Sequence, residues 1–292
     1  MSEDAAHINR SIFNEEAASY DEKHRKLNER LTHELQARLG FIGVDWVLDD
    51  DDSEEGKGED EGSKREVRLL DYACGTGMMS RALAPYTTQC IGVDISEKMV
   101  AAYNATAEKQ GLSPDEMHAV LGDLASATID EALLSPELFN FDIAVVGGGF
   151  HHFGDPELAA RRLVERLKPG GVLLIWDFLP HSPPHRHHQD HHHDGHAEKK
   201  GEEGKETGHD VYHSVMHHGF SEARMQEIFT AAGAGTDFRL EHIGGGYVLA
   251  GHGNQKQGEQ SGGWEGDGKS GDAGKNASRR QVFFARGTKG GA

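Results

Sequence analysis

The sequence contains few cysteines, fewer basic than acidic residues and no long apolar run. Cys74 and Cys90 are the only thiols among 292 residues, which excludes a disulfide framework and favours a reducing compartment. Lys and Arg number 30 against 49 Asp and Glu, for a net charge of −19. Direct nucleic-acid binding is therefore not expected, because phosphate contacts need cations. The N-terminus lacks the basic and apolar regions of a signal peptide, and the longest apolar runs reach about half a membrane span, so we expect no membrane span and a cytoplasmic protein, with the nucleus as an alternative.

Three stretches lack the apolar residues that a core needs. Residues 49–62 hold nine acidic residues and one Lys, a composition that repels itself and stays solvated. Residues 181–210 are rich in His, Lys and Glu, and residues 251–278 contain nine Gly, so both are predicted to be flexible insertions. The rest suits one large domain. We divide the chain into an N-terminal helical lid at 1–48, an acidic loop at 49–66 and a core at 67–292 that contains both insertions.

The remaining sequence alternates between apolar runs of strand length and helical patterns. The helical pattern after the fourth strand begins with Asp155 as N-cap and Pro156 at the first helical position, and it stops at a Pro-Gly-Gly sequence. This alternation predicts an α/β protein with a Rossmann-like doubly wound sheet and helices on both faces. Strands are expected at residues 67–72, 89–95, 117–123, 140–147 and 171–178, and helices at 78–84, 96–110 and 155–168.

Further elements are expected on either side of this region. Leucines at positions 27, 31, 35 and 39 form an apolar stripe, which is typical of a helix packed on the body of a protein. A helix is expected from Ser221 to Ala232, followed by strands at 237–250 and 279–286. Because the last two strands are joined across the Gly-rich insertion, we expect them to pair antiparallel.

A glycine-containing loop, from Asp71 to Gly77, directly follows the first strand. Glycines at the carboxyl end of such a strand let the backbone approach a nucleotide-like ligand closely. Asp94 ends the second strand, where a carboxylate can accept hydrogen bonds from ribose hydroxyls, and Asp123 ends the third, where it can accept from an adenine amine. A dinucleotide-binding loop would have a third glycine where Ser80 stands, and a P-loop would need a following Gly-Lys pair.

These motifs resemble those of the class I S-adenosylmethionine-dependent methyltransferases. The resemblance is strongest to the type 11 branch, which includes the ubiquinone and menaquinone biosynthesis enzymes and many small-molecule enzymes of microbes and fungi. Ala73 stands where the family usually has glycine, a substitution that does not forbid binding. The matching segments, in chain order, are FNEEAASYDE (13–22), LLDYACGTG (69–77), GVDIS (92–96), GD (122–123), FDIAVVGGGFHHF (141–153) and LKPGGVLLIWDF (167–178).

The resemblance implies a seven-stranded sheet with an antiparallel last strand and S-adenosyl-L-methionine as the cofactor. It also implies that Asp94 binds the ribose and that Tyr20 closes over the site. The methionine part is assigned to Asp71, Ala73, Cys74, Gly75, Thr76 and Gly77, with Gly147 beside its amino-acid end. The adenine pocket is assigned to Ile95, Met99, Gly122, Asp123 and Leu124.

Methyl transfer needs an in-line approach, exclusion of water and, for some acceptors, a base. The candidates are His151 and His152 after the fourth strand, and His217 and His218 in the segment before the late helix, of which His218 is preferred. A structural role is the alternative for His152, in which its ring would bond only the backbone at the start of the following helix. The eight His at 181–196 show no spacing that fixes a metal geometry, so no metal site is predicted.

We predict methyl transfer to a small-molecule nucleophile whose reacting atom is nitrogen, oxygen, sulfur or carbon. One alternative is a protein methyltransferase. Another is a regulatory or scaffolding subunit that keeps the cofactor fold and binds a protein partner, or a second copy of the chain, through the flexible loops. An NAD-linked oxidoreductase is a more distant alternative, because the sequence contains no recognisable hydride-transfer constellation.

Overall fold

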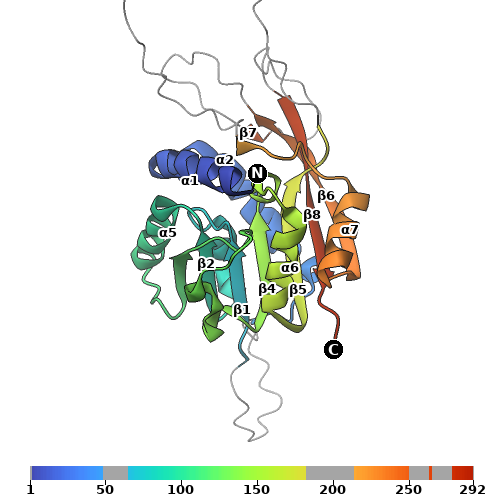
Figure 1. Ribbon diagram of the computed structural model, residues 1–292, viewed down its shortest axis with the longest axis horizontal. Helices are drawn as coiled ribbons and strands as arrows, with labels where there is room; N and C mark the ends of the chain where they lie inside the picture. Colours follow the sequence, from blue (N-terminus) through green and yellow to red (C-terminus); the bar gives the residue numbers. More distant parts are fainter. Residues whose placement is uncertain (1, 49–64, 182–213, 250–262, 265–277, 292) are drawn as a thin grey trace, which may run out of the picture.

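A mixed eight-stranded sheet runs through the computed structural model (Figure 1). The structure describes residues 2–48, 65–181, 214–249, 263–264 and 278–291. The strand order is β3-β2-β1-β4-β5-β8-β6-β7. The strands are β1 (Arg68–Tyr72), β2 (Gln89–Asp94), β3 (Met117–Leu121), β4 (Phe141–Gly147), β5 (Leu167–Phe178), β6 (Thr236–Leu249), β7 (Gly263–Trp264) and β8 (Ser278–Thr288).

The first five strands run parallel, and β8 lies antiparallel between β5 and β6. The predicted doubly wound sheet with an antiparallel last strand is therefore confirmed for its seven main strands. The eighth, β7, adds two residues at the edge, where Trp264 pairs with Tyr247. It lies inside the Gly-rich segment that composition alone predicted to be an insertion without regular structure.

Helices cover both faces of the sheet and meet two apolar layers. Alternate residues of β4 separate the layers, because Ile143 and Val145 join one cluster while Ala144 and Val146 join the other. No helix among the described residues is long and apolar enough to cross a membrane. The α-helices are α1 (Ser2–Glu16), α2 (Tyr20–Gln36), α3 (Leu39–Ile42), α4 (Met78–Leu83), α5 (Glu97–Lys109), α6 (Pro156–Arg166) and α7 (Glu222–Ala232); five short 3-10 turns join them, at Ala17–Ser19, Ala84–Tyr86, Glu131–Leu134, Pro136–Leu138 and Phe150–His152.

The N-caps of α6 and α7 are the residues that the sequence predicts, but α6 ends earlier than predicted. Asp155 accepts a hydrogen bond from the Leu158 amide at 2.9 Å, and Ser221 caps α7 in the same way. We expected α6 to continue to residue 168, whereas it ends at Arg166 because Leu167 is already extended and pairs with Phe141 of β4. Strand pairing thus takes over two residues before the Pro-Gly-Gly sequence is reached.

The helices α1 and α2 lie across one end of the sheet (Figure 1). The predicted leucine stripe anchors them, because Leu27, Leu31 and Leu35 of α2 are buried in the core. Truncating such a residue to alanine typically destabilises a protein by about 2–5 kcal/mol. Polar contacts add to this anchoring, since Thr76 Oγ1 donates a hydrogen bond to Asp21 Oδ1 at 2.5 Å. The N-terminal helices are therefore packed onto the sheet.

Asn14 is the main polar link between α1 and α5. Its Oδ1 accepts hydrogen bonds from Ser96 Oγ at 2.7 Å and from the Lys98 amide at 3.1 Å, while its Nδ2 donates to Glu97 Oε2 at 2.8 Å. Ser96 is also the N-cap of α5. The start of α5 and the middle of α1 are therefore fixed by one side chain.

We expect Asn14→Ala to loosen α1 without unfolding the core. Each lost hydrogen bond contributes about 0.5–1.5 kcal/mol, so amide exchange in α1 should accelerate by about tenfold or more. Hydrogen-exchange mass spectrometry measures this, with Glu15→Ala, an exposed neighbour in the same helix, as the matched control. Equal exchange in the two variants would contradict the anchoring role.

The acidic loop and the His-rich insertion lie outside the described residues, apart from 65–66 and His181. The structural predictions for those segments remain predictions.

Candidate active site

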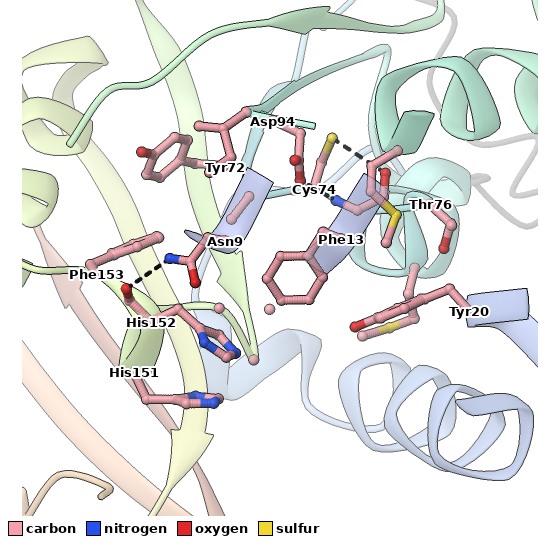
Figure 2. Close-up of a pocket in the computed structure, with 18 of the residues that line it drawn as sticks. Asn9, Phe13, Tyr20, Tyr72, Cys74, Thr76, Asp94, His151, His152 and Phe153 are labelled. Atoms are coloured by element: carbon pink, nitrogen blue, oxygen red, sulfur yellow. Dashed lines mark hydrogen bonds between the residues drawn. The ribbon is translucent and has the colours of Figure 1, made fainter. Parts of the chain in front are cut away.

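A cavity of about 590 Å³ lies between the N-terminal helices and the ends of β1, β2 and β4. Loops that follow parallel strands meet at this edge of the sheet, which is where ligands bind in open α/β folds. Figure 2 shows side chains from α1, α2 and the strand ends that converge on this space. Its volume is within the range of small-molecule sites.

The loop after β1 turns sharply enough to form the floor of the cavity. Gly75 and Gly77 have φ values of 54° and 92°, and Ala73 also adopts a left-handed φ of 52°. That conformation costs an L-residue roughly 1–2 kcal/mol, which explains in physical terms why glycine is expected where Ala73 stands. The loop exposes its backbone to the cavity through Ala73, Cys74, Gly75 and Thr76.

Asp94 and Asp123 hold the loops on either side of this floor. Asp94 Oδ2 accepts from the Gly75 amide at 2.8 Å, and its Oδ1 accepts from the Ser96 amide at 2.9 Å. Asp123 Oδ1 accepts from Tyr72 Oη at 2.9 Å. Burial raises the pKa of Asp94, and the two backbone donors oppose that shift. Both carboxylates line the cavity and retain capacity to accept further hydrogen bonds.

Asp71 is a buried carboxylate with one oxygen unpaired. Ser80 donates to Oδ2 from its amide at 3.1 Å and from its hydroxyl at 2.7 Å. The other oxygen, Oδ1, is buried and has no hydrogen-bond partner among the described residues. Burial raises the pKa of Asp71 to about 7, against the opposing effect of the Ser80 hydrogen bonds. A cationic ligand group at this position would restore the missing interaction.

Two adjacent histidines occupy a different part of the cavity wall (Figure 2). His151 Nδ1 lies 2.9 Å from Oδ1 and 3.1 Å from Oδ2 of Asp177, and His152 Nδ1 lies 2.9 Å from the Ser214 carbonyl oxygen. A carbonyl oxygen only accepts, and an ionised carboxylate does the same, so Nδ1 carries the hydrogen in both rings. In the neutral rings Nε2 is therefore left as a hydrogen-bond acceptor.

Helix α1 and strands β5 and β8 complete the wall around these histidines. Asn9 Nδ2 donates to the His152 carbonyl oxygen at 3.1 Å, while its Oδ1 is buried and unpartnered among the described residues. Phe13 meets the His152 ring edge-on, with centroids 5.3 Å apart. The guanidinium carbon of the buried Arg280 lies 5.2 Å from the centre of the Phe178 ring. This part of the cavity is thus aromatic, with a few polar atoms.

Comparisons with known proteins identify the domain. A profile described as a methyltransferase domain matches residues 70–175. The chain contains a class I methyltransferase domain. It is 33% identical to an uncharacterised methyltransferase of Schizosaccharomyces pombe over 40% of each chain. It is 32% identical to a demethylmenaquinone methyltransferase of Thermus thermophilus over 58% of this chain and 65% of that one. The matches therefore cover less than two thirds of either relative.

A solved structure supports the fold of the chain beyond residues 70–175. The chain resembles the structure of a complex between the Haloferax volcanii Trm112 methyltransferase activator and a methyltransferase, with a TM-score of 0.54 and 16% sequence identity. The alignment covers 96% of this chain and 98% of the other. At this identity the likeness concerns the fold alone.

The cofactor of this methyltransferase class is S-adenosylmethionine, and the buried polar atoms of the cavity fit its amino-acid end. Asp71 Oδ1 lacks a donor, and Trp176 Nε1, which is also buried, lacks an acceptor among the described residues. A side chain at Gly147 would come within 3.0 Å of Trp176 Nε1, so this donor lies beside the end of β4. An ammonium group would donate a hydrogen bond to Asp71 Oδ1, and a carboxylate group would accept one from Trp176 Nε1. Asp94 can accept hydrogen bonds from hydroxyl groups.

Most residues predicted from the sequence line the cavity, and four do not. Leu124 is fully buried in the core, and Gly122 packs on Leu133 beside a separate hollow. Gly77 ends the loop behind the floor, where Tyr103 lies 2.7 Å from the position of an added Cβ. His218 is exposed and its ring faces His181. The residues found in the wall are Tyr20, Asp71, Ala73, Cys74, Gly75, Thr76, Asp94, Ile95, Met99, Asp123, Gly147, His151 and His152.

His218 is a correction to the expected site. Gly219 has a φ of 87° and packs against the carbonyl oxygen of Leu179, and the following Phe220 is buried in the core. The chain therefore directs Phe220 inward and leaves His218 outside the cavity. A catalytic role for His218 has no support from this geometry.

Sequence patterns missed several residues of the methyltransferase site. Asp177 is fully buried behind His151, at the end of β5. An acidic residue at a strand end was the signal that marked Asp94 and Asp123, and it applies equally to Asp177. No comparable local signal marks Asn9 or Arg280, which reach the site only through tertiary packing.

We expect the affinity for S-adenosylhomocysteine to rise with pH because of Asp71. The carboxylate form pairs with the ligand ammonium, and with a pKa of about 7 in the free protein its population rises about tenfold from pH 6 to pH 8. Calorimetry should therefore show about tenfold tighter binding at pH 8 than at pH 6. Asp71→Asn removes the titration and should bind weakly with no such dependence. A pH-dependent affinity retained in this variant would assign the effect to another group.

Proposed function

We propose that the protein transfers a methyl group from S-adenosylmethionine to a small molecule held between the N-terminal helices and the sheet. The observation that supports this most directly is the division of one cavity into two chemically different parts. Unpaired polar atoms that fit the cofactor lie at Asp71 and Trp176, and imidazole rings that can accept hydrogen bonds lie at His151 and His152. The names of the quinone methyltransferases among its relatives agree with a small-molecule acceptor.

The residues of the chain have separable tasks in this function. When bound, S-adenosylmethionine supplies a methyl group on a positively charged sulfur, so the chain itself needs no strong nucleophile. The buried Cys74 fits this, because burial raises the pKa of its thiol far above the ordinary value and keeps it protonated. Phe13, Tyr20 and the other lid residues exclude water, and the histidines face the acceptor.

A protein acceptor is the main rival within enzymes, and a scaffolding subunit is the rival outside them. The net charge of −19 would favour a basic protein substrate. The structural neighbour solved with an activator protein is compatible with a partner protein for this chain as well. The lining of the cavity by both lid helices favours a small acceptor, because a protein side chain would have to enter past them.

Two measurements on the purified full chain test the proposal. Calorimetry with S-adenosylhomocysteine should give one site per chain, and NADH should not bind. Methyl-labelled S-adenosylmethionine is then incubated with the protein and a fractionated cell extract, and mass spectrometry locates the label. We expect it in the small-molecule fraction.

The other outcomes contradict the proposal in distinct ways. Label found only in protein bands would establish a protein methyltransferase. Cofactor binding without any transfer would favour the scaffolding role. Binding of NADH with no response to S-adenosylhomocysteine would overturn the cofactor assignment as well.

A further inference from the structure

We propose that Asp177 is a positioning residue that makes His151, and not His152, the proton acceptor in methyl transfer, and that the group that gives up this proton is a hydroxyl. This inference rests on the proposed function. It starts from the buried contact between Asp177 and His151, to which no sequence pattern assigns a role.

The Asp177 carboxylate is fixed by three hydrogen bonds. The His151 amide donates to Oδ2 at 3.0 Å and the Phe178 amide donates to Oδ1 at 2.7 Å, so the backbone holds both oxygens in place. The third donor is the His151 ring, through Nδ1. Asp177 is fully buried and does not line the cavity, whereas His151 does. The ring thus turns Nδ1 toward the core, and its opposite edge, with Nε2, is presented to the cavity.

His152 has the same tautomer as His151 but a different hydrogen-bond partner. Its Nδ1 donates to an uncharged carbonyl oxygen of Ser214, which provides little compensation for a positive charge on the ring. Burial, together with the neighbouring His151, lowers the pKa of His152 to about 3. His152 therefore stays neutral and can accept a hydrogen bond from the acceptor without taking its proton.

The charged and titratable groups around His151 also favour His151 over His152 as the proton acceptor. His152 lies 4.1 Å away between ring centroids, His181 follows β5, and Arg280 of β8 reaches the same cavity. The arginine is a cation, and burial lowers the pKa of both His152 and His181. Among these groups only the Asp177 carboxylate therefore stabilises a proton on His151. Burial raises the pKa of Asp177, but the His151 charge and the hydrogen bonds outweigh this effect, and the pKa is lowered overall. Asp177 thus remains ionised.

The step balances for a hydroxyl acceptor. The acceptor oxygen forms a bond to the methyl carbon with a lone pair as the carbon–sulfur bond breaks, and the electron pair of that bond stays on sulfur. The hydroxyl proton moves to Nε2 of His151. The positive charge lost at sulfur reappears on the imidazolium ring beside the Asp177 carboxylate, so the total charge of the buried site is unchanged.

The test begins with the unmodified full chain and needs no acceptor. Long-range proton–nitrogen NMR of a sample labelled with 15N-histidine, with S-adenosylhomocysteine present, reports the tautomer of each ring, and His151→Gln assigns the His151 signals by their loss. We expect hydrogen on Nδ1 and a bare Nε2 in His151, and a neutral His152 ring at pH 6. Hydrogen on Nε2 of His151, or a protonated His152 ring at that pH, would overturn the proposal.

Asp177→Asn then separates positioning from packing. An amide at this position can donate to Nδ1 of His151, which moves the ring hydrogen to Nε2 and removes the base. With the acceptor found in the labelling experiment, kcat should fall by on the order of 10²-fold or more, with KM and the affinity for S-adenosylhomocysteine within about threefold of wild type. The matched control is Asp142→Asn, at the opposite end of β4, where the carboxylate accepts from the Arg68 amide.

Each outcome of the mutant experiment bears on the proposal. A fall in kcat accompanied by a loss of cofactor binding would show a structural role for Asp177. Unchanged kcat in a folded variant would overturn the positioning role, and methylation confined to carbon, nitrogen or sulfur would overturn the hydroxyl assignment. If Asp177→Asn fails to fold, the NMR result on the unmodified chain still decides. That result is independent of whether any methyl transfer is found, so failure of the proposed function is distinguishable from failure of this inference.

Discussion

Replacement of His151 by Gln is expected to lower turnover by about 10²- to 10⁴-fold, the usual contribution of a positioned acid or base. Gln can keep a hydrogen bond to Asp177 but cannot take a proton, so the fold and the cofactor affinity should be retained. Turnover on the identified acceptor and calorimetry with S-adenosylhomocysteine measure the two quantities separately.

Two further substitutions test whether the loss of turnover is specific to His151. His152→Gln should act mainly on the KM of the acceptor, because His152 is held neutral and can only accept a hydrogen bond. His242→Gln, at an exposed position of β6, should leave both constants unchanged. Equal losses of kcat in the His151 and His152 variants would show that neither ring has a distinct role.

The second large effect is expected for Asp94→Ala. Removing a carboxylate that hydrogen-bonds a ligand costs on the order of 1.5–3 kcal/mol, which corresponds to roughly 10- to 150-fold weaker binding. The loop at Gly75 should also loosen, because its amide loses the Asp94 acceptor. Calorimetry with S-adenosylhomocysteine measures the change.

Adenosine is the informative second ligand for the Asp94 variant. It has the ribose hydroxyls but no amino-acid end, so its binding should weaken by a similar factor. A variant that loses affinity only for ligands with the amino-acid end would place Asp94 away from the ribose.

The sheet and the cofactor half of the site could be predicted because their signals are local. Apolar runs of strand length, the Asp155 and Ser221 caps and the glycine loop each depend on a few neighbouring residues. Strand ends at one edge of a parallel sheet necessarily meet, so Asp71, Asp94 and Asp123 could be brought together without knowledge of side-chain packing.

The acceptor half could not be predicted in the same way. Asn9 and Arg280 are separated by most of the chain and reach the same cavity only through packing of α1 against the sheet end. The direction of His218 depends on Gly219, whose left-handed φ sends the next residue into the core. The end of α6 depended on a pairing between Leu167 and Phe141, which competes with helix propensity and is not visible in either segment alone.

The two parts of the cavity have different origins along the chain, and this has a consequence for how the protein can change. The part suited to the cofactor comes from strands β1 to β5 and the loops after them, from Asp71 to Trp176, whereas the histidine part is closed by α1, α2 and β8. Substitutions in those outer elements can alter which compound is accepted while the stretch from Asp71 to Trp176 stays intact. New specificities can therefore arise by divergence of the lid and of β8, without a nonfunctional intermediate that has lost its methyl donor.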